Sequence, residues 1–181
     1  RIALKDLYEF DGEEFGDDWR NLSEKIRGKS RENPEWGLKL LKKIGVFRAV
    51  LDIAGTGLPR SELIEDQMLT QVVRMDGFIT GEMNIVKGFR NNEPVRSLEE
   101  YLDTLNEAFE KVVKAGAVGI KSGLAYQRII QYGEVPRYKA EKIMTKGYAD
   151  SSVEDRRVFQ DFMMHEVCKR CAEFKLSLIH I

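Results

Sequence analysis

Cysteine and histidine, the residues that build disulfide frameworks and zinc sites, are scarce in this sequence. The 181 residues include two cysteines and two histidines. Cys168 and Cys171 lie three positions apart in a segment with helical periodicity, a spacing more typical of packed thiols than of a redox pair. No second Cys/His pair is present to complete a zinc site. We therefore interpret both cysteines as packed side chains.

An excess of charge of one sign and a long apolar run are also missing. The 29 basic and 30 acidic residues give a formal net charge of -1, which leaves no electrostatic signature for nucleic acid or an anionic membrane. No apolar run approaches the length of a membrane span, and no signal-peptide pattern opens the chain. These absences predict a cytoplasmic globular protein that acts on a small molecule, without nucleic-acid or membrane partners.

Nucleotide-binding motifs are absent as well, because neither Gly-x-Gly-x-x-Gly nor Gly-x-x-x-x-Gly-Lys-Ser/Thr follows any predicted strand. Amphipathic helices alternate instead with short apolar strands, and Ser97–Glu100 and Ser151–Glu154 have the Ser-x-x-Glu pattern of a helix start. This alternation predicts parallel strands with helical crossovers. We expect an α/β fold, and a (β/α) barrel with only part of its strands present fits this pattern best. The predicted helices cover 2–10, 17–26, 34–44, 98–113, 138–146 and 152–174, and the strands cover 46–53, 72–79, 117–121 and the C-terminus from 176.

Polar residues stand at three predicted strand ends: Asp52, then Arg74 and Asp76, then Lys121. Strand ends on one rim of a barrel bring such groups into a shared pocket. An arginine there can hold a substrate carboxylate or phosphate through two parallel hydrogen bonds. The alternative for Arg74 is a salt bridge to Asp76 or to another acid on the rim.

Lys121 is the candidate catalytic residue. Burial lowers the pKa of a lysine and yields a neutral amine that can form a Schiff base with a carbonyl substrate. The same amine can react with carbon dioxide to give a carbamate that bridges divalent cations, which activate water. The alternative is an ammonium that pairs with Asp52 or Asp76.

The connection after Lys121 runs to about residue 150, and connections of that length are usually functional. Tyr126 and Arg128 open it, and further tyrosines and arginines follow. This segment either covers a pocket or is a structural excursion packed on neighbouring loops.

Two stretches resemble one family. They read Gly116-Ala-Val-Gly-Ile-Lys121-Ser-Gly-Leu-Ala-Tyr126-Gln-Arg128 and Asp161-Phe-Met-Met-His-Glu-Val-Cys-Lys-Arg-Cys-Ala-Glu-Phe-Lys175. Both resemble amidohydrolase-related proteins, in the branch of metal-dependent TIM-barrel hydrolases that are similar to uronate isomerase. The resemblance implies a divalent metal, zinc or manganese, with Lys121 as a ligand if it is carbamylated. It also implies that Tyr126 and Arg128, with Arg74, orient a carboxylate-bearing substrate.

The family pattern has a His-x-His pair on the first barrel strand, a lysine or other ligand on the fourth, histidines on the fifth and sixth, and an aspartate on the eighth. The resemblance implies that the first strand precedes Arg1, that Lys121 is on the fourth and that strands six to eight lie beyond the end of this chain. It thus implies a partial (β/α)8 TIM barrel, with roughly strands two to four and the start of strand five. Residues 176–181 read Leu-Ser-Leu-Ile-His-Ile and resemble the translation of a transposon end used to tag DNA libraries. We therefore expect an incomplete barrel domain over 1–175 and a non-native tail over 176–181. Such a fragment is expected to be inactive alone, and its open sheet edges favour self-association into a homo-oligomer.

The sequence thus predicts a metal-dependent hydrolase of the amidohydrolase superfamily, acting on a small carboxylate-bearing substrate. Three alternatives stay open: a sugar-acid isomerase similar to uronate isomerase, a Schiff-base lyase that uses Lys121, and a non-catalytic piece of a barrel.

Overall fold

The computed structural model describes residues 2–10, 18–33, 35–52 and 68–180. Clustering of backbone contacts divides the chain into an N-terminal unit, Arg1–Ala49, and a C-terminal unit, Val50–Ile181. Each is described by itself below. None of the helices in the described ranges is both long and apolar enough to cross a membrane.

The N-terminal unit contains helices α1 (Ile2–Tyr8), α2 (Asp18–Glu32) and α3 (Trp36–Lys43). An aromatic pair joins α1 to α3, because the indole nitrogen of Trp36 donates to the Tyr8 hydroxyl at 3.1 Å. The ammonium of Lys29 on α2 lies over both rings, 5.4 Å from the centroid of Tyr8 and 5.0 Å from that of Trp36. All three predicted helices are confirmed, and Gly45, at a φ of +81°, follows the last of them.

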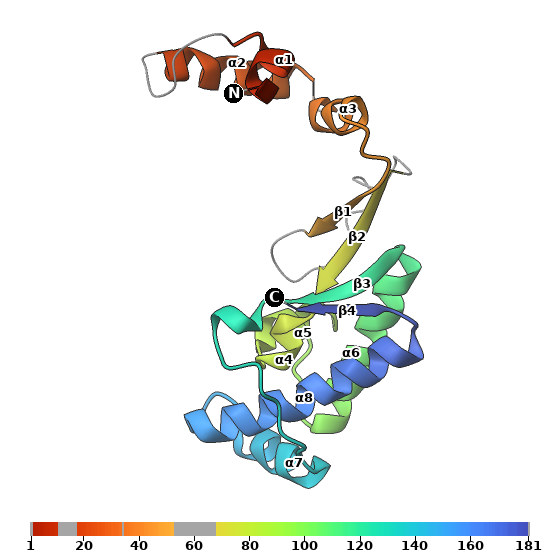
Figure 1. The fold of residues 1–181 in the computed structure, drawn as a ribbon. Coiled ribbons are helices and arrows are strands. Elements are labelled where there is room, and N and C mark those ends of the chain that lie inside the picture. The colour runs from red at the N-terminus through yellow and green to blue at the C-terminus, as the bar shows by residue number, and fades with distance from the viewer. Residues whose placement is uncertain (1, 11–17, 34, 53–67, 181) are drawn as a thin grey trace. The chain divides into compact units, whose positions relative to one another are not determined.

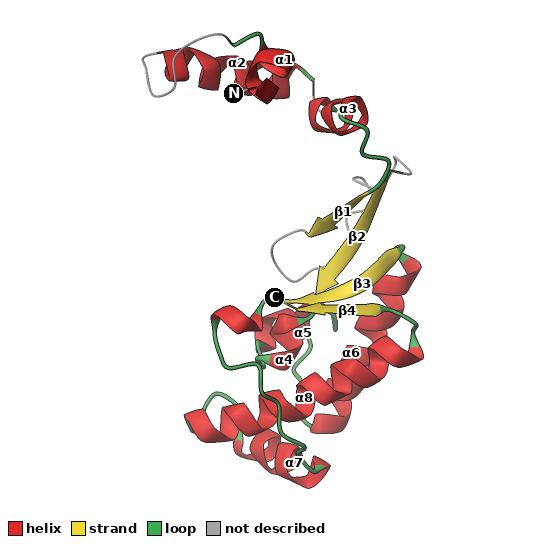
Figure 2. Cartoon of the chain, in the orientation of Figure 1, coloured by secondary structure: helices red, strands yellow, loops and turns green. Residues whose placement is uncertain are grey.

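A four-stranded sheet organises the C-terminal unit, in the order β1-β2-β3-β4. Its strands are β1 (Ala49–Asp52), β2 (Leu69–Arg74), β3 (Ala117–Ser122) and β4 (Ser177–His180). β3 pairs in parallel with β2 and with β4, and the arrow of β1 runs in the same direction as that of β2 (Figure 2). The predicted α/β fold with a parallel sheet is thus confirmed, as a four-stranded sheet.

Helices connect the strands of this unit. Between β2 and β3 come α4 (Asp76–Ile79), α5 (Met83–Gly88) and α6 (Leu98–Lys114). Between β3 and β4 come a 3-10 turn (Leu124–Tyr126), α7 (Arg137–Lys146) and α8 (Val153–Glu173). Helix α6 packs on β3 and α8 packs on β4, so both long helices cover one face of the sheet (Figure 1).

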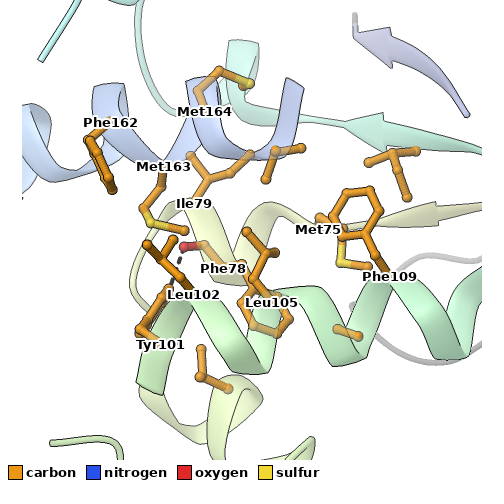
Figure 3. Close-up of a cluster of buried hydrophobic side chains, with 14 of the residues drawn as sticks. Met75, Phe78, Ile79, Tyr101, Leu102, Leu105, Phe109, Phe162, Met163 and Met164 are labelled. Carbon is orange, nitrogen blue, oxygen red and sulfur yellow. Dashed lines mark hydrogen bonds between the residues drawn. The ribbon is translucent and has the colours of Figure 1, made fainter. Parts of the chain in front are cut away.

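The core of the unit lies between that face and the helices (Figure 3). Tyr101 on α6 is fully buried and its hydroxyl donates a 2.7 Å hydrogen bond to the carbonyl of Phe78 on α4. The Tyr101 ring packs edge-on against Phe78 and against Phe159 of α8, with centroid separations of 6.0 and 5.5 Å. This aromatic chain fixes α4, α6 and α8 against one another.

Two predicted strands differ from the observed ones. The predicted strand 72–79 is wrong at both ends, because β2 begins at Leu69 and 76–79 form the helical turn α4. A short apolar run does not reveal from its sequence whether it is extended or helical, and Phe78 and Ile79 are buried within the helical turn. The predicted strand 46–53 is shorter, since β1 covers Ala49–Asp52. Residue 53 and the glycine-rich run 55–59 lie outside the described residues.

The two predicted helix starts have different outcomes. Ser97 caps α6 as expected, because its hydroxyl accepts from the amide of Glu100 at 3.1 Å. The carboxylate of Glu100 accepts from the amide of Arg96, one residue before the cap. At α8 the prediction is off by one residue: Ser152 accepts from the amide of Asp155 at 3.0 Å, while Ser151 donates to the carbonyl of Gly147.

Candidate functional site

The carboxyl ends of β1, β2 and β3 bring three charged side chains together. Arg74 and Lys121 are partners in the register of β2 and β3. The residues that precede them, Val73 and Ile120, belong to the buried core beneath the helices. Since successive strand residues face opposite sides of a sheet, Arg74 and Lys121 lie on the face opposite the helices.

Asp52, at the end of β1, receives both cations. Its Oδ1 accepts from Arg74 Nε at 2.9 Å, and its Oδ2 accepts from Arg74 Nη2 at 2.7 Å. Lys121 Nζ donates to the same Oδ2 at 2.6 Å. Of the alternatives left open by the sequence, the structure shows Lys121 paired with Asp52 and Arg74 paired with a rim acid other than Asp76.

The charges of this cluster stabilise one another. The hydrogen bonds from Arg74, opposed by burial and reinforced by those from Lys121, lower the pKa of Asp52 from 3.8 to about 2. Asp52 in turn raises the pKa of Arg74. The side chains are 23% (Asp52), 28% (Arg74) and 15% (Lys121) exposed, so the cluster is partly shielded from solvent.

The turn after β3 packs closely on the cluster. The amide of Gly123 donates to Asp76 Oδ2 at 2.9 Å. A Cβ on residue 123 would lie 3.4 Å from Arg74 Nη1, 3.5 Å from Asp76 Oδ2 and 3.9 Å from the ring of Tyr126. Tyr126 therefore borders the cluster, with 80% of its surface exposed.

Arg128 has different neighbours from those of Arg74 and Lys121. Its guanidinium donates to Gln160 at 2.9 Å and to Asp161 at 2.6 Å, both on α8, and lies 4.4 Å from the ring centroid of Tyr132. Its side chain is 12% exposed. The sequence gives no local signal for this arrangement, since Asp161 is 33 residues away. The structure thus brings Arg74 and Lys121 together, with Tyr126 beside them, and engages Arg128 with α8.

The described residues do not fit a metal centre. Within the described ranges, no group of three or more histidine, cysteine, aspartate or glutamate side chains could hold a metal ion. The amine of Lys121 is occupied by its ion pair with Asp52, whereas a carbamate requires a neutral amine. The metal, and Lys121 as its carbamylated ligand, remain predictions.

A parallel α/β sheet with polar groups at its carboxyl ends defines the class of fold, and comparison with solved structures agrees. Uronate isomerase from Thermotoga maritima superposes on this chain with a TM-score of 0.74 at 15% sequence identity. The match covers 99% of this chain and 42% of that enzyme, so the chain spans less than half of the enzyme's length. At this identity the likeness shows the fold alone. No protein-family model matches the sequence, and no curated protein is significantly similar to it.

Proposed function

We propose that this chain contributes the carboxylate-binding part of a sugar-acid isomerase of the uronate isomerase kind. In this proposal β1, β2 and β3 are consecutive strands of a (β/α)8 barrel related to the amidohydrolases, β4 lies within the tail 176–181 that the sequence predicts to be non-native, and the activity is that of the complete gene product. The structural likeness to uronate isomerase supports the proposal.

The observation that carries the proposal is the convergence of Arg74 and Lys121 on one carboxylate. A bidentate arginine fixes the plane of a carboxylate, and a lysine on one of its oxygens adds a point charge. Asp52 occupies this position in the structure. A sugar acid offers the same group, so its carboxylate competes with that of Asp52 for the two cations.

This competition provides a base for isomerisation. While Asp52 is paired with Arg74 and Lys121 its pKa of about 2 makes it a weak base. Once the substrate carboxylate takes over the cations, the proton affinity of Asp52 rises towards that of an ordinary aspartate. Asp52 then removes the proton from the carbon beside the carbonyl carbon and returns it to the carbonyl carbon, while a proton passes between the two oxygens. The products are a ketose and an unchanged carboxylate.

The other predicted activities have less support. Schiff-base chemistry requires Lys121 to lose both its proton and its ion pair. The metal-dependent hydrolase predicted from the sequence depends on ligands that the resemblance places mostly outside this chain, so it stays an alternative that the activity assay must decide. The isomerase keeps Arg74 and Lys121 as carboxylate-binding cations, with the substrate carboxylate in place of that of Asp52.

Incubation with D-glucuronate tests this function. The complete gene product is expected to form a ketose, and Lys121→Met is expected to lower kcat/KM by about a hundredfold, because one of two charge-assisted contacts is lost. Lys139→Met, on an exposed position of α7, is the matched control and retains wild-type kcat/KM. Hydrolysis of amides or esters without ketose formation would refute the isomerase and favour the hydrolase.

A further inference from the structure

Asp76 joins the end of β2 to the turn that follows β3. It lies two residues after Arg74, as the first residue of α4, and its Oδ2 accepts from the amide of Gly123 at 2.9 Å. The two residues of this contact are 47 positions apart in the chain. A hydrogen bond from a backbone amide to a carboxylate is charge-assisted and therefore strong. Asp76 thus fixes the turn after β3 against the carboxyl end of β2.

The core holds the same turn from its other side. Leu124 is 1% exposed and belongs to the buried core, and its amide donates to the hydroxyl of Ser122 at 3.3 Å. The amide of Tyr126 donates to the carbonyl of Gly123 at 3.2 Å, which closes the 3-10 turn. These contacts leave the turn little freedom to move away from the strand ends.

Gly123 places the turn beside the guanidinium of Arg74. The position that a Cβ would occupy on residue 123 lies 3.4 Å from Arg74 Nη1 and 3.5 Å from Asp76 Oδ2. Asp52 binds the other two nitrogens of the guanidinium, Nε and Nη2. Arg74 therefore has Asp52 along one edge and the turn next to its remaining nitrogen.

This second contact becomes important when a ligand replaces Asp52. In the proposed function the substrate carboxylate displaces Asp52 and so removes the two hydrogen bonds that orient Arg74. An arginine free to move would lose side-chain entropy on binding the ligand, which lowers the affinity. The turn takes no part in the exchange. Asp52 is the main cause of the raised pKa of Arg74, and the charge of Asp76 adds to it against the opposing effect of burial.

We propose that Asp76 is a positioning residue of the carboxylate site: through Gly123 it holds the turn beside Arg74, and the turn keeps the guanidinium oriented for a substrate carboxylate. This inference rests on the proposed function, in which Arg74 and Lys121 bind the carboxylate of a sugar acid. Asp76 acts from behind Arg74 and makes no contact with the ligand. Support of this kind gives a binding site its precision.

Calorimetric titration of the full chain with D-glucuronate and with D-glucose tests this role. Asp76→Ala removes the acceptor for the amide of Gly123, whereas Asp76→Asn keeps an oxygen that can accept from it. We expect Asp76→Ala to lower the preference for D-glucuronate over D-glucose about fivefold, and Asp76→Asn to retain most of the preference. Asp103→Ala, at an exposed position of α6, is the matched control and keeps the wild-type preference. Because the preference is a ratio of two affinities of one protein, a smaller folded fraction does not change it.

Hydrogen exchange of the Gly123 amide, followed by NMR, measures the contact without any sugar. We expect exchange to be slower in the wild type and in Asp76→Asn than in Asp76→Ala, because only the first two offer an acceptor to this amide. Equal exchange rates in the wild type and Asp76→Ala would show that the hydrogen bond does not hold the turn, and would overturn the proposed role of Asp76.

The binding results separate this inference from the proposed function. An unchanged preference in Asp76→Ala, or an equal loss in Asp76→Ala and Asp76→Asn, would overturn the positioning role while leaving the carboxylate site intact. A preference that falls in Asp76→Ala and is unaffected by Lys121→Met would retain the role of Asp76 and overturn the two-cation site of the proposed function. If the wild-type chain does not prefer D-glucuronate, both proposals are wrong.

Discussion

Lys121 and Asp52 are joined by a 2.6 Å ion pair across the ends of β3 and β1, although 69 residues separate them in the chain. Arg74 binds both oxygens of the same carboxylate from β2. One aspartate thereby connects three neighbouring parallel strands at their carboxyl ends. The cluster is both a structural contact and the carboxylate-binding geometry on which the proposed function depends.

The pKa of Asp52 makes part of the stability dependent on pH. Because the folded-state pKa is lowered from 3.8 to about 2, the stabilisation is fully present above about pH 4 and is lost as the pH falls towards 2. We expect a contribution of about 1 kcal/mol, after allowance for solvent screening at this partly exposed site. Urea unfolding at a series of pH values from about 5 down to about 2 measures how the free energy of unfolding changes with pH. In Asp52→Asn the free energy of unfolding should depend less on pH in this range than in the wild type. The same pH dependence in both proteins would contradict the lowered pKa of Asp52.

Arg128 is expected to be more important for stability than an exposed arginine. In Arg128→Met the carboxylate of Asp161, 19% exposed, loses its cation, which should lower the free energy of unfolding by about 3 kcal/mol. Arg137→Met is the matched control, because Arg137 pairs with Glu99 and Glu141 at an exposed position, where solvent screens the ion pairs, and its loss should cost clearly less. Equal unfolding midpoints for the two variants would show that the contact with α8 is not structural.

The Tyr101 hydroxyl offers a test of the core. Tyr101→Phe leaves the buried carbonyl of Phe78 without this donor, so we expect a loss of about 2 kcal/mol in chemical denaturation. Tyr138→Phe removes a hydroxyl from a side chain that is 64% exposed and should be neutral. A neutral Tyr101→Phe would mean that the observed hydrogen bond adds nothing to stability.

Gly81 supports the connection between α4 and α5 through its lack of a side chain. A Cβ there would lie 2.6 Å from the ring of Tyr148, and the φ of +70° is strained for other residues. Gly81→Ala should therefore lower the free energy of unfolding by at least about 2 kcal/mol. Gly88→Ala has nothing within 4 Å of the added carbon and serves as the control in the same thermal melt. If the two variants have the same melting temperature, the ring of Tyr148 does not lie as close to residue 81 as described.

The sequence predicts well those elements that have a strong local hydrophobic pattern and the residues that end each strand. The amphipathic stripe of α6 and the apolar run of β3 are strong local patterns, and both elements lie where they are expected. The placement of Asp52, Arg74 and Lys121 on one edge follows from the parallel order of their strands. Which cation pairs with which acid depends on side-chain distances between strands, so the sequence left that choice open.

Contacts between distant segments explain what the sequence does not predict. Arg128 reaches Asp161 on α8, and no spacing rule connects a loop residue to a helix that begins 25 positions later (Val153 minus Arg128). The helical turn 76–79 is predicted as strand because its short apolar run carries no periodicity that distinguishes a strand from a helix.

The proposed function rests on the pair of cations formed by Arg74 and Lys121, and calorimetric comparison of D-glucuronate with D-glucose tests that pair most directly. The two sugars differ by the carboxylate. The wild-type chain is expected to bind D-glucuronate at least about tenfold more tightly than D-glucose, and Lys121→Met should lower this preference, because Arg74 alone then binds the carboxylate. Equal affinities of the wild-type chain for the two sugars, or a preference that Lys121→Met leaves unchanged, would contradict the account.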